Sequence, residues 1–146
     1  MKKYIRDGRA PIPKEKLTSE IMSRIRAKNT KPELLLRKAL RRIGLKQFKL
    51  HDKKLPGRAD ISFPKNKLAI FVNGCYWHRC PKCKPAMPKT HIKFWGDKFK
   101  RNKVRDKKKI LLLSKLGWES VVVWECEIKK NISKVTLKIK RLISIR

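Results

Sequence analysis

Acidic residues are scarce in this chain of 146 residues, which carries 11 aspartates and glutamates against 42 lysines and arginines, a formal net charge of +31. Such a surplus repels itself in a compact protein and is best tolerated beside a polyanion. Coding bias or life at high temperature could supply the lysines, but plentiful glutamate would be expected with them, and there are only six glutamates. The charge therefore favours a nucleic acid as the partner, because each neutralised phosphate releases condensed counterions.

Long apolar runs are also absent. None approaches the ~18 residues of a membrane span, and the opening MKKYIRDGRAPIP lacks the apolar core of a signal peptide. We therefore expect an intracellular, cytoplasmic protein with no membrane partner, in which thiols stay reduced. Four cysteines in such a protein favour metal binding over two disulfides.

The chain shows no internal repeat and no second domain, and its length and 40% hydrophobic content suit one hydrophobic core. Residues 1–16 are basic and contain two prolines, which predicts a flexible N-terminal arm. We expect residues 17–146 to form a single domain.

Two helices are predicted before the first strand. Residues 19–29 favour a short basic helix, and residues 30–45 favour a second one with Thr30 as N-cap, Glu33 completing a capping box and Gly44 at the far end. The apolar face of the second helix is predicted from the spacing of its hydrophobic residues, which are Leu34, Leu35, Ala39, Leu40 and Ile43.

The remaining elements alternate. LPGRADISF (55–63) reads as a turn followed by a strand, PKNK as a hairpin turn, and LAIFV (68–72) as a strand covered on both faces. A long basic helix over 94–117 leads to a second buried strand within 118–128, parallel to an earlier one. An amphipathic helix over 132–145 closes the chain. This order predicts an α/β fold, a mixed sheet flanked by helices.

Cysteine spacing predicts a metal site. Cys75, Cys80 and Cys83 are separated by four and then two residues, and Cys126 follows at the end of the second buried strand. Thiolates so spaced can converge on one tetrahedral Zn²⁺, and a closed four-thiolate site leaves no open position for water, which indicates a structural ion. Buried free thiols are the alternative, and Cys126 fits that interpretation best.

Three residues could carry chemistry beside this loop. Asp60 interrupts a strand-like segment and is a natural Mg²⁺ ligand, although a turn aspartate bonded to backbone amides is the alternative. His78 could ligate zinc, but four cysteines already fill four positions, which leaves the imidazole free to act as a general base. Asp106 on the basic helix could orient it, or could be a solvated charge. His51 and His91 lie in basic loops and are expected at the surface without a role.

The segments LPGRAD, GCYWHRC, FWGDKFKRNKVRD, LGW and VVWEC follow one another in a familiar order and spacing. From about Ile21 to Glu127 the chain resembles the very short patch repair (Vsr) mismatch endonucleases. The resemblance implies a restriction-endonuclease-like fold and a Mg²⁺-dependent enzyme that nicks one DNA strand 5′ of the T in a T·G mismatch. It also implies mismatched double-stranded DNA as substrate. We expect a monomer, and whether other mismatch-repair proteins are further partners stays open.

The resemblance also implies roles for single residues. Asp60 and the backbone carbonyl of Val72 match the family's Mg²⁺ ligands, and Glu33 matches a glutamate that holds metal-bound water. His78 matches the general base and Asp106 its partner.

Aromatic residues of the loop and of the basic helix carry a further implication. Tyr76, Trp77 and Trp95 resemble residues that wedge into the base stack at the mismatch, and Met22 resembles a side chain inserted from the opposite groove. A mismatched step is weakly stacked, so opening it costs less than opening a paired step. For Trp77 and Trp95 the alternative is core packing, which is what we expect of Trp118 and Trp124.

The chain departs from the family pattern at several positions. The zinc site is all cysteine where relatives often use histidine, Asn73 stands where a histidine is usual, and the strand 68–72 lacks the Glu-x-Lys of ordinary restriction enzymes.

Two other functions stay open. The chain could be a nuclease of the same fold acting on another lesion or sequence, or a zinc-stapled nucleic-acid-binding protein without catalysis. Asp60, His78 and Asp106 together favour the enzyme.

Overall fold

The structure is a computed structural model that describes residues 28–146. The expected arm over 1–16, most of the expected helix over 19–29 and Met22 lie outside the described residues. In chain order the elements are α2 (Lys31–Arg42), β1 (Lys49–Leu50), β2 (Ile61–Phe63), the 3₁₀ turn η1 (Pro64–Asn66), β3 (Leu68–Asn73), α3 (Cys75–His78), α4 (Ile92–Lys115), β4 (Glu119–Trp124) and α5 (Glu125–Ser144).

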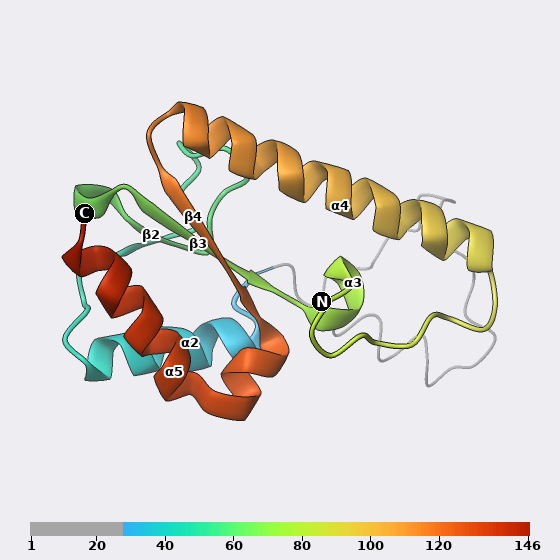
Figure 1. The fold of residues 1–146 in the computed structure, drawn as a ribbon, viewed down its shortest axis with the longest axis horizontal. Helices are drawn as coiled ribbons and strands as arrows, with labels where there is room; N and C mark the ends of the chain where they lie inside the picture. Colours follow the sequence, from blue (N-terminus) through green and yellow to red (C-terminus); the bar gives the residue numbers. More distant parts are fainter. Residues whose placement is uncertain (1–27) are drawn as a thin grey trace, which may run out of the picture.

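The described strands form one mixed sheet in the order β1-β2-β3-β4. The pairs β1–β2 and β2–β3 are antiparallel, whereas β4 runs parallel to β3 after the crossover through α4 (Figure 1). The register of the parallel pair runs from Leu68 opposite Glu119 to Asn73 opposite Trp124. The predicted mixed α/β architecture, the hairpin at PKNK and the parallel crossover are therefore confirmed.

Helices cover both faces of the sheet, with α4 on one side and α2 and α5 on the other (Figure 1). Leu36 and Leu40 of α2 and Ile139 of α5 are fully buried against the strand residues of one face. On the opposite face Leu113 of α4 packs in a cluster with Phe71. As predicted, β3 is covered on both faces. The strand β4 was also expected to be buried, but it is fully buried only at alternate positions.

The predicted apolar face of α2 is right only in part, since Leu40 is fully buried and Ala39 is half-buried. Leu34 and Leu35 are 47% and 41% exposed, and Ile43 is also exposed. The buried face consists of residues spaced by three and four along the helix, and it includes a charged pair: Glu33, Leu36, Arg37 and Leu40. Counting only apolar residues misses this face, because an ion pair can be buried when its charges satisfy each other.

The helix caps also differ in detail from the expected ones. Thr30 is the N-cap of α2, yet its side chain makes no bond to the helix amides. Instead its hydroxyl donates to the Glu33 carboxylate (3.2 Å), which also accepts the backbone N–H of Asn29 (3.0 Å). Glu33 therefore organises the entrance to the helix.

The last helix starts earlier than expected. It begins at Glu125, directly after β4, and has a kink at Asn131 where the backbone leaves helical geometry (φ −158°, ψ 85°). Cys126 consequently lies in the first turn of α5 and not at the end of the strand. The helix is amphipathic as predicted, since Ile132, Val135, Ile139 and Leu142 all pack in or against the core cluster. Within residues 28–146, every helix is too short or too polar to cross a membrane.

Candidate active site

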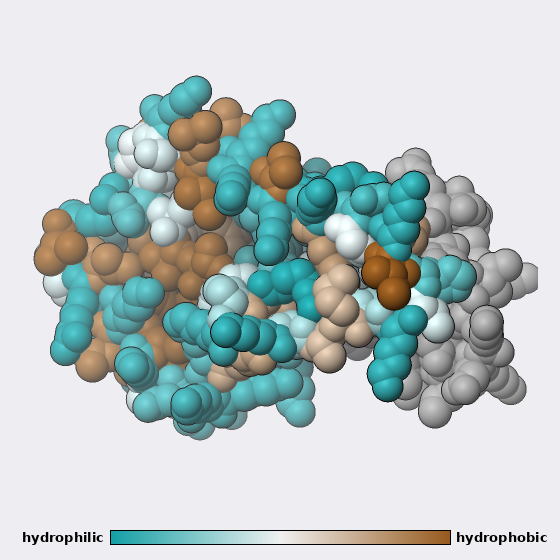
Figure 2. Space-filling view, turned by 45° about the vertical axis from the view of Figure 1, so that its right-hand side comes forward, coloured by the Kyte–Doolittle hydropathy of each residue, from teal (hydrophilic) through white to brown (hydrophobic). Residues whose placement is uncertain are grey.

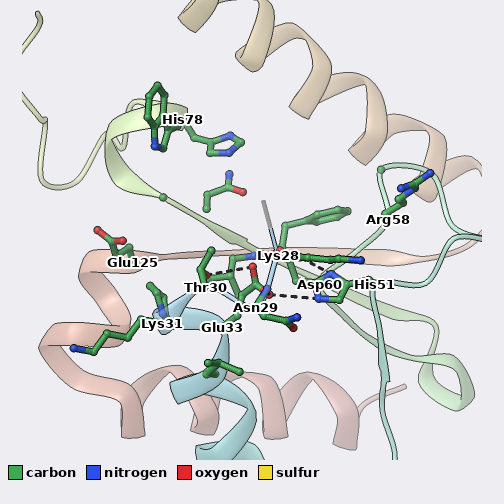
Figure 3. Close-up of a pocket in the computed structure, with 18 of the residues that line it drawn as sticks. Lys28, Asn29, Thr30, Lys31, Glu33, His51, Arg58, Asp60, His78 and Glu125 are labelled. Carbon is green, nitrogen blue, oxygen red and sulfur yellow. Dashed lines mark hydrogen bonds and ion pairs between the residues drawn. The ribbon is translucent and has the colours of Figure 1, made fainter. Parts of the chain in front are cut away.

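An open cleft of about 980 Å³ lies where the N-terminus of α2, the start of β2, the end of β3, α3 and the C-terminal half of α4 come together (Figure 3). Polar side chains line it from several of these elements, and they include Glu33, His51, Asp60, Asn73, His78 and Lys109. His78 projects from α3 on one side of the cleft, whereas Asp60 and His51 lie together on the other (Figure 3).

Asp60 stands immediately before β2, where antiparallel pairing with β3 brings it alongside Val72. Its Oδ2 accepts the backbone N–H of Val72 at 2.7 Å. Burial raises the pKa of Asp60 to about 6, with the Glu33 carboxylate adding to the effect, although the Val72 bond and the nearby Lys109 and Arg37 act in the opposite direction. The bond to one backbone amide matches the structural alternative in part, but it leaves Oδ1 free.

Asp60 belongs to a group that extends beyond the expected residues. Ligand atoms of Glu33, His51 and Asp60 all lie within 4.8 Å of one another, an arrangement that could hold a metal ion. His51 Nδ1 is 3.9 Å from Asp60 Oδ1, and its Nε2 is 3.6 Å from Glu33 Oε2. The expectation that His51 lies at the surface is therefore wrong, since only 20% of its side chain is exposed.

The reason His51 was missed is the shortness of β1. This strand has two residues, and its pairing of Leu50 with Ile61 carries His51 to a position opposite Asp60, where its N–H donates to the Asp60 carbonyl (3.3 Å). A strand of two residues has no periodicity to recognise. The only local signal is the proximity of HD (51–52) to LPGRAD in the chain.

His78 and Asp106 meet as expected. His78 closes α3, and its Nδ1 is 2.6 Å from Oδ2 of Asp106 on α4. Burial acts to raise the pKa of Asp106, but the His78 bond and the Lys109 ammonium, 3.1 Å from Oδ1, outweigh it and lower the pKa. Asp106 is thus a carboxylate at neutral pH, which places the imidazole proton on Nδ1 and leaves Nε2 free to accept another.

The aromatic residues form a cluster beside this pair. Trp95 is 8% exposed and stacks on Phe99, with ring centroids 6.1 Å apart. Trp77 lines the cleft, and the Lys98 ammonium lies over both indoles, 5.1 Å from the Trp77 ring and 5.3 Å from the Trp95 ring. The burial of Trp95 fits core packing, the alternative to a wedge into DNA. Trp77, by contrast, faces the cleft.

The four cysteines form a second group, its first and last members following the cleft residues Gly74 and Glu125 in the chain. Their sulfur atoms lie within 4.8 Å of one another, and Cys80 Sγ is 3.8 Å from Cys126 Sγ. A tetrahedron with Zn–S bonds of about 2.3 Å has sulfur atoms about 3.8 Å apart, so the residues fit a zinc ion. His78 is not among them, because its ring is bonded to Asp106.

Comparison with known proteins identifies the family. A family model described as "DNA mismatch endonuclease Vsr" matches residues 12–84, half of the chain. The chain is 42% identical to the "Type II nicking enzyme V.XorIIP" of Xanthomonas oryzae pv. oryzae over 74% of its own length and 79% of the relative's. It belongs to the Vsr family of DNA endonucleases.

Further relatives agree with this assignment. Identity to the "DNA mismatch endonuclease Vsr" of Escherichia coli strain K12 is 35%, covering 76% of this chain and 70% of the relative. Identity to the "Type II nicking enzyme V.NmeAIP" of Neisseria meningitidis serogroup A is 40%, covering 77% of this chain and 80% of the relative. The family match includes Glu33, Asp60 and His78, whereas Asp106 lies beyond it.

Proposed function

We propose that this Vsr-family protein is a Mg²⁺-dependent endonuclease that nicks one DNA strand 5′ of the T in a T·G mismatch. One observation carries the proposal. A single cleft holds a carboxylate with an unoccupied oxygen, Asp60, and an imidazole whose proton is fixed by a second carboxylate, His78 with Asp106. A protein that only binds DNA has no use for this combination. The fold would then be a restriction-endonuclease-like sheet with Asp60 at the β2–β3 hairpin.

The proposed chemistry assigns one task to each residue. Asp106 accepts the Nδ1–H of His78, so that Nε2 removes a proton from the water that attacks the scissile phosphorus. Asp60, the Val72 carbonyl and Glu33 would hold Mg²⁺ and its waters, since this ion prefers oxygen ligands. When bound, the ion would stabilise negative charge that develops on the phosphate and on the leaving 3′ oxygen.

The surroundings of the cleft suit a DNA backbone. The α4 helix, which contributes Lys109 to the cleft, exposes several basic side chains, namely Lys100, Arg101, Lys103, Arg105, Lys107 and Lys108. Hydrophilic side chains cover much of the face seen in Figure 2. Such contacts position a duplex without reading its sequence.

Mismatch preference would come from the aromatic cluster. Trp77 faces the cleft, and Tyr76 packs edge-on against it with centroids 5.0 Å apart. Trp95 and Phe99 support these two rings from behind, so Tyr76 and Trp77 are the better candidates for a wedge. A wedge would enter a mismatched step at lower cost than a paired one.

The test is a labelled duplex with one T·G pair, incubated at single turnover with Mg²⁺. We expect a nick 5′ of the T that disappears in Asp60→Ala and His78→Ala. Asp106→Asn should slow nicking by about 10²–10⁴-fold, because an amide no longer fixes the charged imidazole. Asp97→Asn, an exposed aspartate of the same helix, is the matched control and should nick normally. If Asp60→Ala and His78→Ala both nick at the wild-type rate, the roles are wrong.

A second candidate has support from the relatives' names. Several are called type II nicking enzymes, so the same assay should include a matched T·A duplex and a duplex with another mismatch. Equal nicking of the matched duplex would favour a sequence-specific nickase. Binding without any nicking in Mg²⁺ would favour the non-catalytic alternative.

A further inference from the structure

We propose that Arg37 and His51 form a positioning relay that holds the free oxygen of Asp60 towards its metal ion. The relay starts from the buried ion pair of α2, passes through an imidazole that sequence analysis had left without a role, and ends at the proposed metal ligand. This inference rests on the proposed metal site and deepens it.

The first step concerns the proton on His51. Arg37 NH2 lies 3.0 Å from His51 Nε2. A guanidinium has only N–H donors and no acceptor, so Nε2 must accept. The remaining proton of the neutral ring is then on Nδ1. The contact with Arg37 thus selects one tautomer, in the way that a partner on one ring nitrogen decides the state of the other.

The second step concerns what that proton faces. Nδ1 lies 3.9 Å from Asp60 Oδ1, which is longer than a hydrogen bond and can be closed by turning either side chain. The other oxygen of Asp60 is already engaged by the Val72 N–H at 2.7 Å. Asp60 therefore accepts one hydrogen bond on Oδ2 and faces a second donor across a gap on Oδ1. Closing that gap would restrain the plane of its carboxylate from both sides.

The same geometry argues against His51 as a direct metal ligand. Its Nε2 lone pair is directed at Arg37, and its Nδ1 carries the proton, so neither nitrogen is free to bind an ion. The 3.6 Å separation between Nε2 and Glu33 Oε2 joins two acceptors. Arg37 NH2 explains it, because this one group donates to both, to Glu33 at 3.1 Å and to His51 at 3.0 Å.

The third step explains why an arginine is buried on α2. The Arg37 side chain is 6% exposed, and its NH1 donates to the Asn29 side chain at 2.9 Å. Burying a guanidinium is costly unless its donors are paired, and Nε of Arg37 is buried without a hydrogen-bond partner. Arg37 holds Glu33 and His51 together, and both flank Asp60. The bonds of Arg37 to Glu33 and His51 therefore explain why an arginine is found at this buried position.

The experiment measures metal binding without DNA. Zinc-loaded protein is titrated with Mn²⁺, and the concentration of free Mn²⁺ is followed by electron paramagnetic resonance. The difference in bound Mn²⁺ between the wild type and Asp60→Ala gives the binding at this site. We expect His51→Ala to weaken Mn²⁺ binding by about 10–100-fold, the usual effect of losing a group that orients a ligand. His51→Gln should recover most of this loss, because its carbonyl can accept from Arg37 while its NH₂ donates to Asp60.

The matched control is His91→Ala, which removes an exposed histidine and should bind Mn²⁺ like the wild type. Thermal unfolding of each variant separates a change in binding from a loss of fold. Three results would overturn the relay. These are unchanged Mn²⁺ binding in folded His51→Ala, no recovery in folded His51→Gln, and a nitrogen hyperfine coupling to bound Mn²⁺ that vanishes in His51→Ala. The last would make His51 a ligand.

Failure of the proposed function looks different from failure of the relay. If the wild type binds Mn²⁺ through Asp60 but nicks no T·G duplex, the substrate assignment fails and the relay stands. If it nicks the duplex while His51→Ala binds Mn²⁺ normally, the relay fails and the function stands.

Discussion

Asp60 is a residue whose surroundings oppose its charge. Burial raises its pKa to about 6 from an ordinary value of 3.8, so between these two values the native state holds a proton that the unfolded chain has released. Native stability therefore falls as pH rises through this window and levels off above it. The carboxylate costs stability in the metal-free protein at neutral pH, as expected of a group kept for binding a cation.

Asp60→Asn should make that cost visible. An amide oxygen can still accept the Val72 N–H, but it has no charge to desolvate. Compared with the wild type, the variant's advantage in free energy of unfolding should grow by about 1 kcal/mol between pH 5 and pH 8 without Mg²⁺. Urea titrations at the two pH values measure it. An advantage that is constant with pH, or that shrinks, would contradict the raised pKa.

Gly57 is a second residue with a measurable consequence. Its φ is +78°, and a Cβ there would lie 2.6 Å from Cδ and 2.8 Å from Cβ of Lys109, the lysine that is paired with Asp106. Gly57→Ala should lower the free energy of unfolding by more than the roughly 1 kcal/mol that a positive φ costs alanine. It should also slow nicking by shifting Lys109.

Gly44→Ala is the matched control. Gly44 has a similar φ of +89°, but a Cβ there would have no neighbour within 4 Å. Its loss of stability should therefore be the backbone cost alone, with nicking unchanged. Equal losses in urea unfolding for the two variants would show that the Lys109 contact relaxes without cost.

At this scale, the pairing of His78 with Asp106 was expected from the resemblance to the Vsr family, since the chemistry of the two residues alone left Asp106 open as a solvated charge. His51 could not be predicted. Its place depends on a two-residue strand and on a buried arginine, and neither leaves a periodic signal in the chain.

Among the elements, the segment between β3 and α4, which includes α3, contains most of the cysteine group. Cys75, Cys80 and Cys83 belong to this loop, whereas Cys126 belongs to α5, and their sulfurs fit one tetrahedral ion. A zinc ion bound there would link the end of β3 to the start of α5, which follows β4 directly. It would thereby hold the segment that carries His78 in place.

Removing that ion should abolish nicking while the sheet persists. After treatment with a zinc chelator, Mg²⁺ alone should not restore activity, whereas Zn²⁺ followed by Mg²⁺ should. Cys126→Ala should contain no stoichiometric zinc by elemental analysis, yet keep a wild-type far-ultraviolet circular dichroism spectrum at low temperature. A zinc-free wild-type protein with full activity would show that the thiols are structural without an ion.

The elements themselves differed in how far they could be predicted. The run LAIFV identified β3 and the Gly-terminated basic run identified α4, since length and continuous patterning decide such cases. The buried face of α2 and the start of α5 could not be found in this way. The first includes Glu33 and Arg37, which look like surface residues, and the second follows a strand with no intervening turn.

For the whole molecule, the net charge of +31 predicts a steep dependence of DNA binding on salt. Each phosphate contact adds about −0.9 to the slope of log K against log salt. Replacing Lys103, Lys107 and Lys108 of α4 with glutamine should make this slope shallower for any duplex and leave the preference for T·G unchanged. Fluorescence anisotropy across a KCl series measures the slope.

The control set replaces Lys134, Lys138 and Lys140 of α5, which lie on the helix that covers the other face of the sheet. These changes remove the same charge and should alter the slope less. Equal slopes for the two sets would mean that binding follows total charge and not the α4 surface.

The parallel pairing of β3 with β4 has a consequence for how the enzyme is made. The Asp60–Val72 contact forms within a hairpin, but β4 and Cys126 are needed before the loop bearing His78 is tied down. A crossover of this length pairs its strands only after the whole helix has been synthesised. A chain still emerging from the ribosome would already be strongly basic, but without Cys126 it would lack the complete four-cysteine group beside His78.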